Sequence, residues 1–376
     1  MSAPDVVVVG GGAIGASVAW RCAARGIAVT LIEETPGRGS TWAAAGMLAP
    51  VTEAHFGEER LLELNIDSSR RWSAFAAELE ELTGASIGYE QCGTVMVAPD
   101  ADGFAVISEL LDYQERLDLK VERLSRTELR ALEPALAPGI RGGALVEGDH
   151  HVDNRALVDA LLDACRLTGV ELHAGSVASI TTRGDRVVGV ELDGGESRPC
   201  EQVVVAAGCW SGGIEGVPDE IRSAVRPVKG QLLYLRGPVG APPITRNVRS
   251  PDIYIVPRGD GRIVVGATVE EMGWDVTVTA DAVYTLLRDA FAVVPALDAF
   301  ELIECVAGLR PGSRDNAPII GPGGPRGLVV ATGHYRNGIL LTPVTADSVA
   351  EIVATGGVPD AIREFTPSRL VVGDAQ

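Results

Sequence analysis

The chain has 376 residues, of which 46% are hydrophobic and 22% charged, a balance typical of folded globular proteins. The 32 basic and 51 acidic residues leave a formal net charge of −19 at pH 7, which argues against nucleic acid and anionic lipid as partners. The six cysteines are scattered without a CxxC pair and the five histidines do not cluster, so we expect a reduced, cytoplasmic protein without a metal site.

The longest apolar stretch, residues 6–20, is too short and too rich in glycine to be a membrane span, which needs ~20 residues. Asp5 precedes it, where a signal peptide would carry a basic residue. We therefore expect neither a membrane segment nor a secretion signal.

The same stretch predicts a dinucleotide-binding βαβ unit. Residues 5–9 read as a buried strand, residues 13–25 as a helix, and residues 28–32 as a second buried strand. The turn that joins the first strand to the helix carries the pattern GxGxxG. An acidic residue, Glu33, ends the second strand about 20 residues further on, which completes the fingerprint.

Each residue of the glycine turn has a physical task in binding a dinucleotide. Gly10 permits the tight turn, Gly12 lets the backbone approach the pyrophosphate, and Gly15 lets the helix pack closely on the sheet. The first helical residues, Ala13 and Ile14, belong to a helix N-terminus whose free N–H groups and partial positive charge suit the phosphates.

The acidic end of the second strand identifies the kind of dinucleotide. Glu33, with Glu34 beside it, is suited to accept hydrogen bonds from the adenosine ribose hydroxyls and to repel the 2′-phosphate of NADP. A glycine-rich turn in an unrelated α/β fold, which is the structural alternative, does not explain Glu33.

The remaining elements follow in chain order and predict a mixed α/β fold of two domains. A capping box at Ser125 and Glu128 opens a short helix that stops near Pro134, and residues 221–279 are rich in strands. Further helices are predicted at residues 58–82, 104–117, 153–167, 280–293 and 343–354, and further strands at residues 92–98, 170–172, 180–182, 187–192, 202–206 and 327–332.

The βα units cluster in three separate stretches, so the chain is expected to cross between its domains. Residues 1–85, 148–222 and 300–370 are predicted to form a discontinuous, Rossmann-like cofactor-binding domain. Residues 86–147 and 223–299 are predicted to form a strand-rich substrate-binding domain of antiparallel sheet and helices.

Two further small-residue segments favour FAD over NAD. The strand at 202–206 ends in Ala-Gly, which allows close passage beside a bound dinucleotide, and residues 40–48 read STWAAAGML. In both, the chain resembles the D-amino-acid oxidase family of FAD-dependent amine and amino-acid oxidases, although a packed turn of small residues is the alternative for 40–48. The residues that the resemblance places at FAD are Ser40, Thr41, Ala45, Gly46, Met47, Ala207 and Gly208.

Two arginine segments near the C-terminus narrow the resemblance. Residues 308–312 read GLRPG and residues 333–341 read GHYRNGILL, with APIIG at 317–321 between them. This pattern is similar to the glycine oxidase branch of the family, and the similarity runs through the whole chain, including PVKGQ at 227–231 and YIVPR at 254–258.

The resemblance implies an enzyme that oxidises the Cα–N bond of an amino acid. Non-covalently bound FAD takes a hydride from Cα to leave an imine, and then passes its electrons to O2 to give hydrogen peroxide. The implied substrates are glycine and also sarcosine or small D-amino acids, with the imine of glycine supplied to the thiazole of thiamine. Members of the family often form tetramers, so a homo-oligomer is expected.

The substrate carboxylate requires a cation in a dry pocket, and Arg310 is the first candidate. An arginine fork pairs bidentately with a carboxylate, and we expect Pro311 and Gly312 to hold it on a rigid turn. The resemblance gives Tyr254 a hydrogen bond to the same carboxylate, and makes Arg336 a second substrate-binding or flavin-side arginine. The structural alternatives are a surface arginine, an ordinary strand tyrosine, and a salt bridge that holds the last loop.

The resemblance also places the pyrimidine end of the flavin against the last loop and adenine at the backbone of Val177. Backbone N–H groups at residues 338–340 would stabilise negative charge on the reduced ring. We interpret His334 as a flavin-loop residue rather than as a base. The residues of this loop are His334, Tyr335, Arg336, Asn337, Gly338, Ile339 and Leu340.

Two positions depart from the family pattern. Cys305 and Val306 stand where the family commonly has a tryptophan, and Cys305 falls near the position where monomeric sarcosine oxidases attach FAD. We interpret it as a buried thiol. Residues 268–272 contain a pocket-wall position that the sequence does not assign, which leaves the substrate size open.

Four other functions remain as alternatives. They are a broader D-amino-acid or sarcosine oxidase, a quinone-linked dehydrogenase, a non-catalytic flavin redox module, and an NAD-dependent dehydrogenase. A redox module does not require a carboxylate clamp, a quinone-linked enzyme is expected to carry a basic membrane-docking stretch, and an NAD enzyme does not explain the segments at 40–48 and 334–340.

Overall fold

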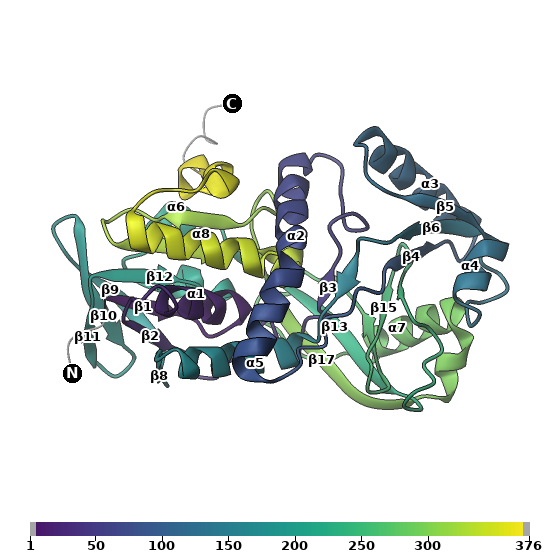
Figure 1. The fold of residues 1–376 in the computed structure, drawn as a ribbon, viewed down its shortest axis with the longest axis horizontal. Helices are drawn as coiled ribbons and strands as arrows, with labels where there is room; N and C mark the ends of the chain where they lie inside the picture. Colours follow the sequence, from purple (N-terminus) through teal and green to yellow (C-terminus); the bar gives the residue numbers. More distant parts are fainter. Residues whose placement is uncertain (1–4, 371–376) are drawn as a thin grey trace.

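A computed structural model, which describes residues 5–370, shows two large sheets on either side of the long helix α2 (Glu59–Thr83) (Figure 1). The predicted mixed α/β class is confirmed. One sheet has six strands and the other has eight.

The six-stranded sheet contains the predicted βαβ unit. Its order is β18-β19-β12-β1-β2-β8, and all neighbours are parallel except β18 and β19. The strands are β1 (Val6–Val9), β2 (Val29–Ile32), β8 (Glu171–His173), β12 (Gln202–Val205), β18 (Ile319–Pro322) and β19 (Leu328–Thr332).

Alternate side chains of this sheet enter two different cores, as the period of two of a strand requires. Val6 and Val8 of β1 pack with four helices, whereas Val7 and Val9 pack with a small antiparallel sheet on the other face. The helices are α1 (Ala13–Ala23), α2, α5 (Asn154–Leu167) and α8 (Thr342–Thr355). The small sheet consists of β9 (Val177–Arg183), β10 (Arg186–Leu192) and β11 (Ser197–Pro199).

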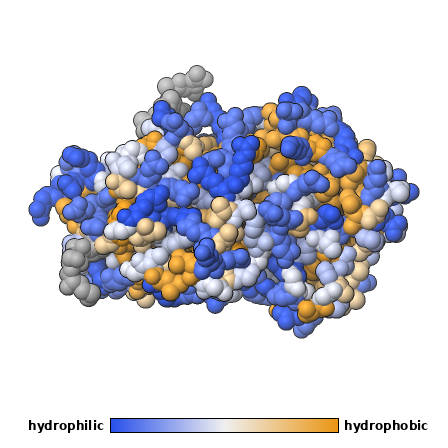
Figure 2. Space-filling view, viewed as in Figure 1, coloured by the Kyte–Doolittle hydropathy of each residue, from blue (hydrophilic) through white to orange (hydrophobic). Residues whose placement is uncertain are grey.

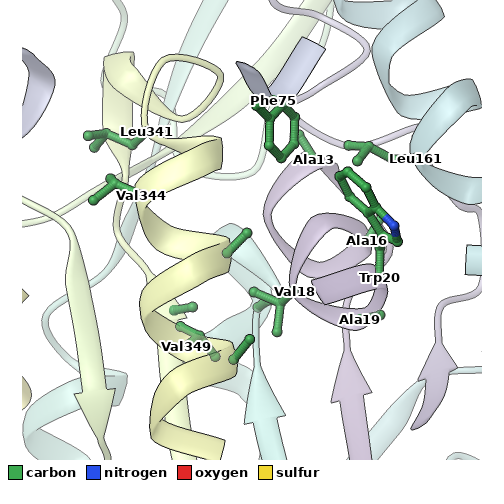
Figure 3. Packing of buried hydrophobic residues seen from close by; sticks show 14 of the residues in the cluster. Ala13, Ala16, Val18, Ala19, Trp20, Phe75, Leu161, Leu341, Val344 and Val349 are labelled. Carbon is green, nitrogen blue, oxygen red and sulfur yellow. The ribbon is translucent and has the colours of Figure 1, made fainter. Parts of the chain in front are cut away.

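Helix α1 packs closely because its buried side is lined by alanines. Figure 3 shows α1 beside α8, with Val18 directed toward α8 and Trp20 directed toward Phe75 and Leu161. The Trp20 and Phe75 rings meet edge to face with centroids 5.4 Å apart, a favoured aromatic geometry. This packing fixes the helix N-terminus relative to the strand ends.

The eight-stranded sheet has the order β17-β13-β16-β15-β14-β4-β6-β5. One face packs on α4 (Arg126–Leu132) and α7 (Ala280–Val293), and α3 (Ala101–Arg116) covers part of the other. The strands are β4 (Thr94–Val97), β5 (Glu122–Ser125), β6 (Gly142–Val146), β13 (Arg226–Arg236), β14 (Asn247–Arg249), β15 (Tyr254–Pro257), β16 (Arg262–Gly266) and β17 (Glu301–Gly312).

Shorter elements complete the fold. The loop after β2 leads to β3 (Met47–Leu48), which pairs with β7 (His150–His151). The others are α6 (Asp219–Arg222) and the 3-10 helices η1 (Gly208–Gly213), η2 (Pro295–Ala299), η3 (Tyr335–Asn337), η4 (Asp360–Phe365) and η5 (Pro367–Leu370).

The capping box at Ser125 and the predicted βαβ unit, the strands at 180–182 and 187–192, and the helices are present, with small shifts at their ends. The expected rigid turn at Arg310 is wrong, because residues 301–312 form β17, which pairs along its length with β13. This strand belongs to the eight-stranded sheet, whereas the predicted domain boundary placed residues after 300 on the cofactor side. Apart from this strand, the division into two domains stays a prediction.

The surface is mixed in character. Figure 2 shows hydrophilic residues interspersed with smaller hydrophobic areas on the face seen in Figure 1. Between residues 5 and 370, no helix is long and apolar enough to cross a membrane.

Candidate active site

A cavity of about 950 Å³ runs from the strand ends of the six-stranded sheet to one face of the eight-stranded sheet. Gly12 and Glu33 line one end, and Tyr254 and Arg310 line the other. The volume is near the upper end of the ~300–1,000 Å³ that is usual for ligand sites, so the cavity suits a large cofactor together with a small substrate.

The glycine turn brings β1 very close to β12. Gly10 has φ +108°, and a Cβ there would lie 2.5 Å from the carbonyl oxygen of Ala206. Gly15 does not line the cavity; a Cβ there would lie 1.8 Å from the carbonyl oxygen of Gly10, so it serves the packing of α1. Gly12, Ala13 and Ile14 face the cavity, and the first turn of α1 has no acidic residue. The positive helix end is therefore open to an anion.

The predicted adenosine end lies at the carboxyl ends of β2 and β8. Glu33 accepts hydrogen bonds from the backbone N–H groups of Gly11 (2.9 Å) and Thr35 (3.1 Å). Glu34 and Val177 line the same end. Their arrangement is compatible with the predicted contacts to ribose and adenine, since Glu33 keeps partial exposure.

The two predicted hydroxyls both line the cavity but also hold the protein together. Thr41 Oγ1 accepts a hydrogen bond from the N–H of Ala13 (3.1 Å), at the start of α1. Ser40 Oγ donates to the carbonyl oxygen of Leu309 (2.5 Å) and so joins the cofactor side to β17. These hydroxyls position the loop whether or not they also contact the cofactor.

The predicted flavin loop, with Ala45, Gly46 and Met47, passes over the eight-stranded sheet. The Gly46 carbonyl accepts from the N–H of Val152, and the Ala45 carbonyl accepts from Nη2 of the buried Arg258 (2.6 Å). No role for Arg258 is predictable from the sequence, because no local pattern shows that this residue reaches a loop more than 200 residues earlier in the chain.

Most of the C-terminal loop also faces the cavity. His334, Tyr335, Arg336, Gly338 and Ile339 line it, as do Ala207 and Gly208, but Asn337 and Leu340 do not. The Leu340 carbonyl accepts from Ser68 Oγ (2.7 Å) and Trp72 Nε1 (2.8 Å), which ties the loop to α2. Burial lowers the pKa of His334 to about 3, and its Nε2 lies 3.1 Å from Thr345 Oγ1. A neutral, engaged imidazole agrees with its interpretation as a loop residue.

The register of four neighbouring strand pairs brings together the side chains at the substrate end of the cavity. Arg249 of β14 lies opposite Tyr254 of β15, and Tyr254 lies opposite Gly266 of β16. Gly266 is paired with Leu232 of β13. Gly230, two residues before Leu232 on the same strand, lies directly under the guanidinium of Arg310 on the neighbouring strand β17. Since residues two apart on a strand share a face, the side chains of Arg249, Tyr254 and Arg310 all project from the same face of the sheet.

At the substrate end of the cavity, two glycines lie directly beneath the side chains of Arg310 and Tyr254. A Cβ on Gly230 would lie 2.1 Å from Arg310 Nη1, and a Cβ on Gly266 would lie 2.5 Å from the Tyr254 hydroxyl oxygen. Both side chains therefore lie close over a glycine, and any larger residue there would displace them.

The charge of Arg310 is free for an anion. Its Nη1 donates to the backbone carbonyl oxygens of Thr268 (3.1 Å) and Lys229 (3.3 Å), which fix the guanidinium. Within residues 5–370, no carboxylate lies within 4.0 Å of it. Burial raises the pKa of Tyr254 to about 12 against the opposing effect of Arg310, so its hydroxyl stays a donor at neutral pH.

Four charged or titratable residues near this end were not foreseen. Arg249 Nη1 contacts Glu53 Oε1 at 2.7 Å, and Arg336 Nη2 contacts Glu58 Oε2 at 2.8 Å. His55 interacts electrostatically with both pairs, and its pKa is lowered by burial and by the charge of Arg336. The predicted alternative for Arg336, a salt bridge, is thus present although the residue also faces the cavity. The pattern EAHF at 53–56 carries no signal that predicts these pairs.

The structure shows where the two positions that depart from the family pattern, Cys305 and residues 268–272, lie relative to the cavity. Cys305 is not among the cavity residues; it lies five residues from Arg310 on β17, and so on the opposite face, against the core that includes α7. It is only partly buried, so the interpretation as a buried thiol is wrong. In residues 268–272, Val269 lines the cavity, while Glu270 accepts from Gln231 and contacts Lys229 instead. No group of three or more possible metal ligands occurs within the described part of the chain.

The site fits FAD on three structural points: the open N-terminus of α1, the acid at the end of β2, and one long cavity that connects both to the eight-stranded sheet. These are features of a dinucleotide-dependent oxidoreductase with an anionic substrate. The family described as FAD dependent oxidoreductase (DAO) matches residues 5–352, and the chain belongs to it. The predicted family and the predicted cofactor, FAD, are confirmed.

The similar proteins cover nearly the whole chain. The bifunctional protein ThiO/ThiG of Synechocystis sp. is 35% identical over 98% of this chain and 54% of its own length. The glycine oxidase of Geobacillus kaustophilus is 34% identical over 93% of this chain and 92% of its own. A crystal structure of glycine oxidase from that organism matches with a TM-score of 0.89 and 32% identity, over 97% of this chain and 98% of the other. The chain spans about half the length of the ThiO/ThiG relatives it matches.

Proposed function

We propose that the protein is a glycine oxidase of the ThiO type, which oxidises glycine with O2 to an imine and hydrogen peroxide, after which water hydrolyses the imine to glyoxylate and ammonia. The observation that carries the proposal is Arg310, an arginine without a carboxylate partner among residues 5–370, fixed beside Tyr254 in the cavity that begins at the glycine fingerprint.

The residues around the cavity divide between cofactor and substrate. Gly12, Ala13 and Glu33 would hold the pyrophosphate and adenosine of FAD, and the loops at 43–47 and 334–339 would hold the flavin. Bound FAD supplies the two-electron acceptor that takes the hydride from Cα and returns the electrons to O2. We propose that it is held without a covalent bond, because Cys305 faces away from the cavity.

The chain's own part in the reaction is to bind and orient the substrate. Arg310 pairs with the carboxylate, and the Tyr254 hydroxyl adds a donor, which together fix the orientation of Cα. His334, the histidine in the flavin loop, is neutral and engaged with Thr345, so it does not act as a base. We propose that the substrate amine enters the reaction neutral, after losing its proton to solvent.

The relatives named glycine oxidase support a small substrate. Met47 and Val269, two apolar residues that line the cavity, are compatible with glycine, sarcosine or D-alanine as candidates. The ThiO part of the bifunctional relatives supports the supply of the glycine imine to the thiazole of thiamine. The cytoplasmic location and the homo-oligomer stay predictions.

One experiment tests this function. The purified protein should be yellow with bound FAD, release that flavin on acid precipitation, and form peroxide with glycine. Arg310→Met should keep the flavin spectrum and lose about a hundredfold in kcat/KM, since breaking a buried charge pair costs about 2–5 kcal/mol.

Several outcomes would contradict the proposal. A colourless protein would refute the cofactor, and turnover of D-alanine but not glycine would refute the substrate. Turnover only with a quinone as acceptor would favour a dehydrogenase, and an Arg310→Met variant with unchanged kinetics would remove Arg310 from the site.

A further inference from the structure

The cavity wall carries a second arginine that already has a carboxylate partner. Arg249 and Glu53 are joined at 2.7 Å, and their side chains are only 22% and 14% exposed. Arg249 lies directly opposite Tyr254 in the sheet, so their Cβ atoms are about 4.5–5.5 Å apart on one face. The ion pair therefore stands next to the proposed carboxylate clamp.

The loop that carries Glu53 is held in place by a buried acid. Asp149 accepts hydrogen bonds from the backbone N–H groups of Val51 (3.2 Å) and Thr52 (2.7 Å). Thr52 is itself buried. Since the residues just before Glu53 are fixed, its carboxylate is presented to Arg249 by a rigid segment rather than by a mobile loop.

We propose that Glu53 determines specificity: by neutralising Arg249, it excludes amino acids that carry a second carboxylate. This inference rests on the proposed function, because it takes the arginine–tyrosine clamp to bind the first carboxylate. Without Glu53, Arg310 and Arg249 would offer two cations in one cavity. With Glu53, the charge of Arg249 is balanced, and a second carboxylate would gain no net attraction there while lying close to the like-charged Glu53 carboxylate, which is unfavourable where water is scarce.

Another arginine in the cavity lining also has a glutamate partner. Arg336 is paired with Glu58 at 2.8 Å, with side chains 21% and 16% exposed. Of the three arginines at the substrate end, only Arg310 lacks a carboxylate within 4.0 Å among the described residues. The cavity thus offers one open cationic position, which matches one carboxylate.

The test compares two substrate pairs that differ by a carboxylate: sarcosine with iminodiacetate, and D-alanine with D-aspartate. In the FAD-loaded wild type, kcat/KM should favour the monocarboxylate in both pairs by at least about a hundredfold. Glu53→Gln should raise kcat/KM for the dicarboxylate, and so lower the monocarboxylate-to-dicarboxylate ratio of kcat/KM tenfold or more in at least one pair. The double variant Glu53→Gln/Arg249→Met should lose that gain, because the released cation is gone.

Binding without turnover gives an independent readout. Titration of the flavin absorbance with acetate and malonate should show that malonate binds at least tenfold more tightly to Glu53→Gln than to wild type, while acetate changes less. Glu53→Ala gives the same test if the glutamine variant folds poorly. Glu78→Gln is the matched control, because Glu78 of α2 pairs with Arg21 of α1, neither residue lines the cavity, and the variant should leave both ratios unchanged.

The outcomes separate the two proposals. If neither ratio nor malonate binding changes in both Glu53 variants, or if the wild type oxidises iminodiacetate as well as sarcosine, the role of Glu53 is refuted and the oxidase proposal stands. If the wild type oxidises none of the amines, the proposed function fails, and the malonate titration still decides whether Glu53 excludes a second carboxylate.

Discussion

The cofactor end of the cavity is made within one βαβ unit, whereas the substrate end is made by segments far apart in the chain. Gly10, Gly12 and Glu33 follow one another around a single turn and strand. Tyr254 and Arg310 meet only because β15, β16, β13 and β17 pair in a fixed register. The cofactor end therefore depends on local backbone geometry, whereas the substrate end depends on the strand register of a whole sheet.

The difference also shows in how each end tolerates change. At the cofactor end, glycines meet backbone atoms, such as the Ala206 carbonyl beside Gly10. At the substrate end, Gly230 and Gly266 meet the tips of side chains, which can move without unfolding the protein. Substitutions at the first end should affect cofactor binding or folding, and those at the second should affect catalysis alone.

The largest effect is expected from Gly12→Val. A Cβ at Gly12 meets only Thr41 Oγ1, at 3.2 Å, so the fold should survive while the side chain fills the phosphate side of the cavity. Overpacking costs about 1–3 kcal/mol, which corresponds to a rise in the FAD Kd of up to about 150-fold. Reconstitution of apoprotein with FAD measures it, and Gly139→Val, in open space, is the control. An unchanged Kd would mean that the glycine turn does not contact bound FAD.

A smaller effect is expected from Gly230→Ala. The new methyl group would displace the Arg310 guanidinium, and the loss of a bidentate pair worth about 2 kcal/mol lowers kcat/KM for glycine roughly 30-fold. Thermal unfolding should be little changed. Lost stability with retained kcat/KM would show that Gly230 serves folding rather than the arginine.

Tyr254→Phe should be milder still. It removes one hydrogen bond to a charged group, about 1.5 kcal/mol, and so lowers kcat/KM about tenfold. Because the pKa of Tyr254 is raised to about 12, the hydroxyl does not titrate in the working range, and the pH profile should keep its shape. A shifted profile would give Tyr254 a part in proton transfer. Gly266→Ala, which displaces the same ring, should resemble it.

The smallest effect concerns stability at mildly acidic pH. His334 has a folded-state pKa of about 3 against its usual 6.5, so the unfolded chain binds the proton first and stability falls as the pH drops from about 6.5 toward 3. Between pH 7 and 6 the loss for this residue is below about 1 kcal/mol. Denaturant unfolding of His334→Gln should show a shallower fall than wild type. An equal fall would mean that the imidazole is not buried in its neutral form.

The two ends also differ in what the sequence could predict. The fingerprint, the capping box at Ser125 and the helices are local patterns, and they are present as predicted. Arg310 was expected on a turn because Pro and Gly follow it, but pairing with β13 overrides that local preference. Glu53, His55 and Arg249 could not be predicted, because their proximity depends on loop placement and strand register, which leave no local pattern.

The role of Arg310 can be isolated by removing either partner of the pair: the carboxylate of the substrate or the guanidinium of Arg310. Peroxide formation is measured with glycine and with glycinamide, for wild type and for Arg310→Met. If Arg310 binds the carboxylate, wild type prefers glycine about a hundredfold or more and the variant shows little preference, since the pair is then already broken. An equal preference for glycine in both proteins would mean that the carboxylate is bound elsewhere and would contradict the assignment of this site.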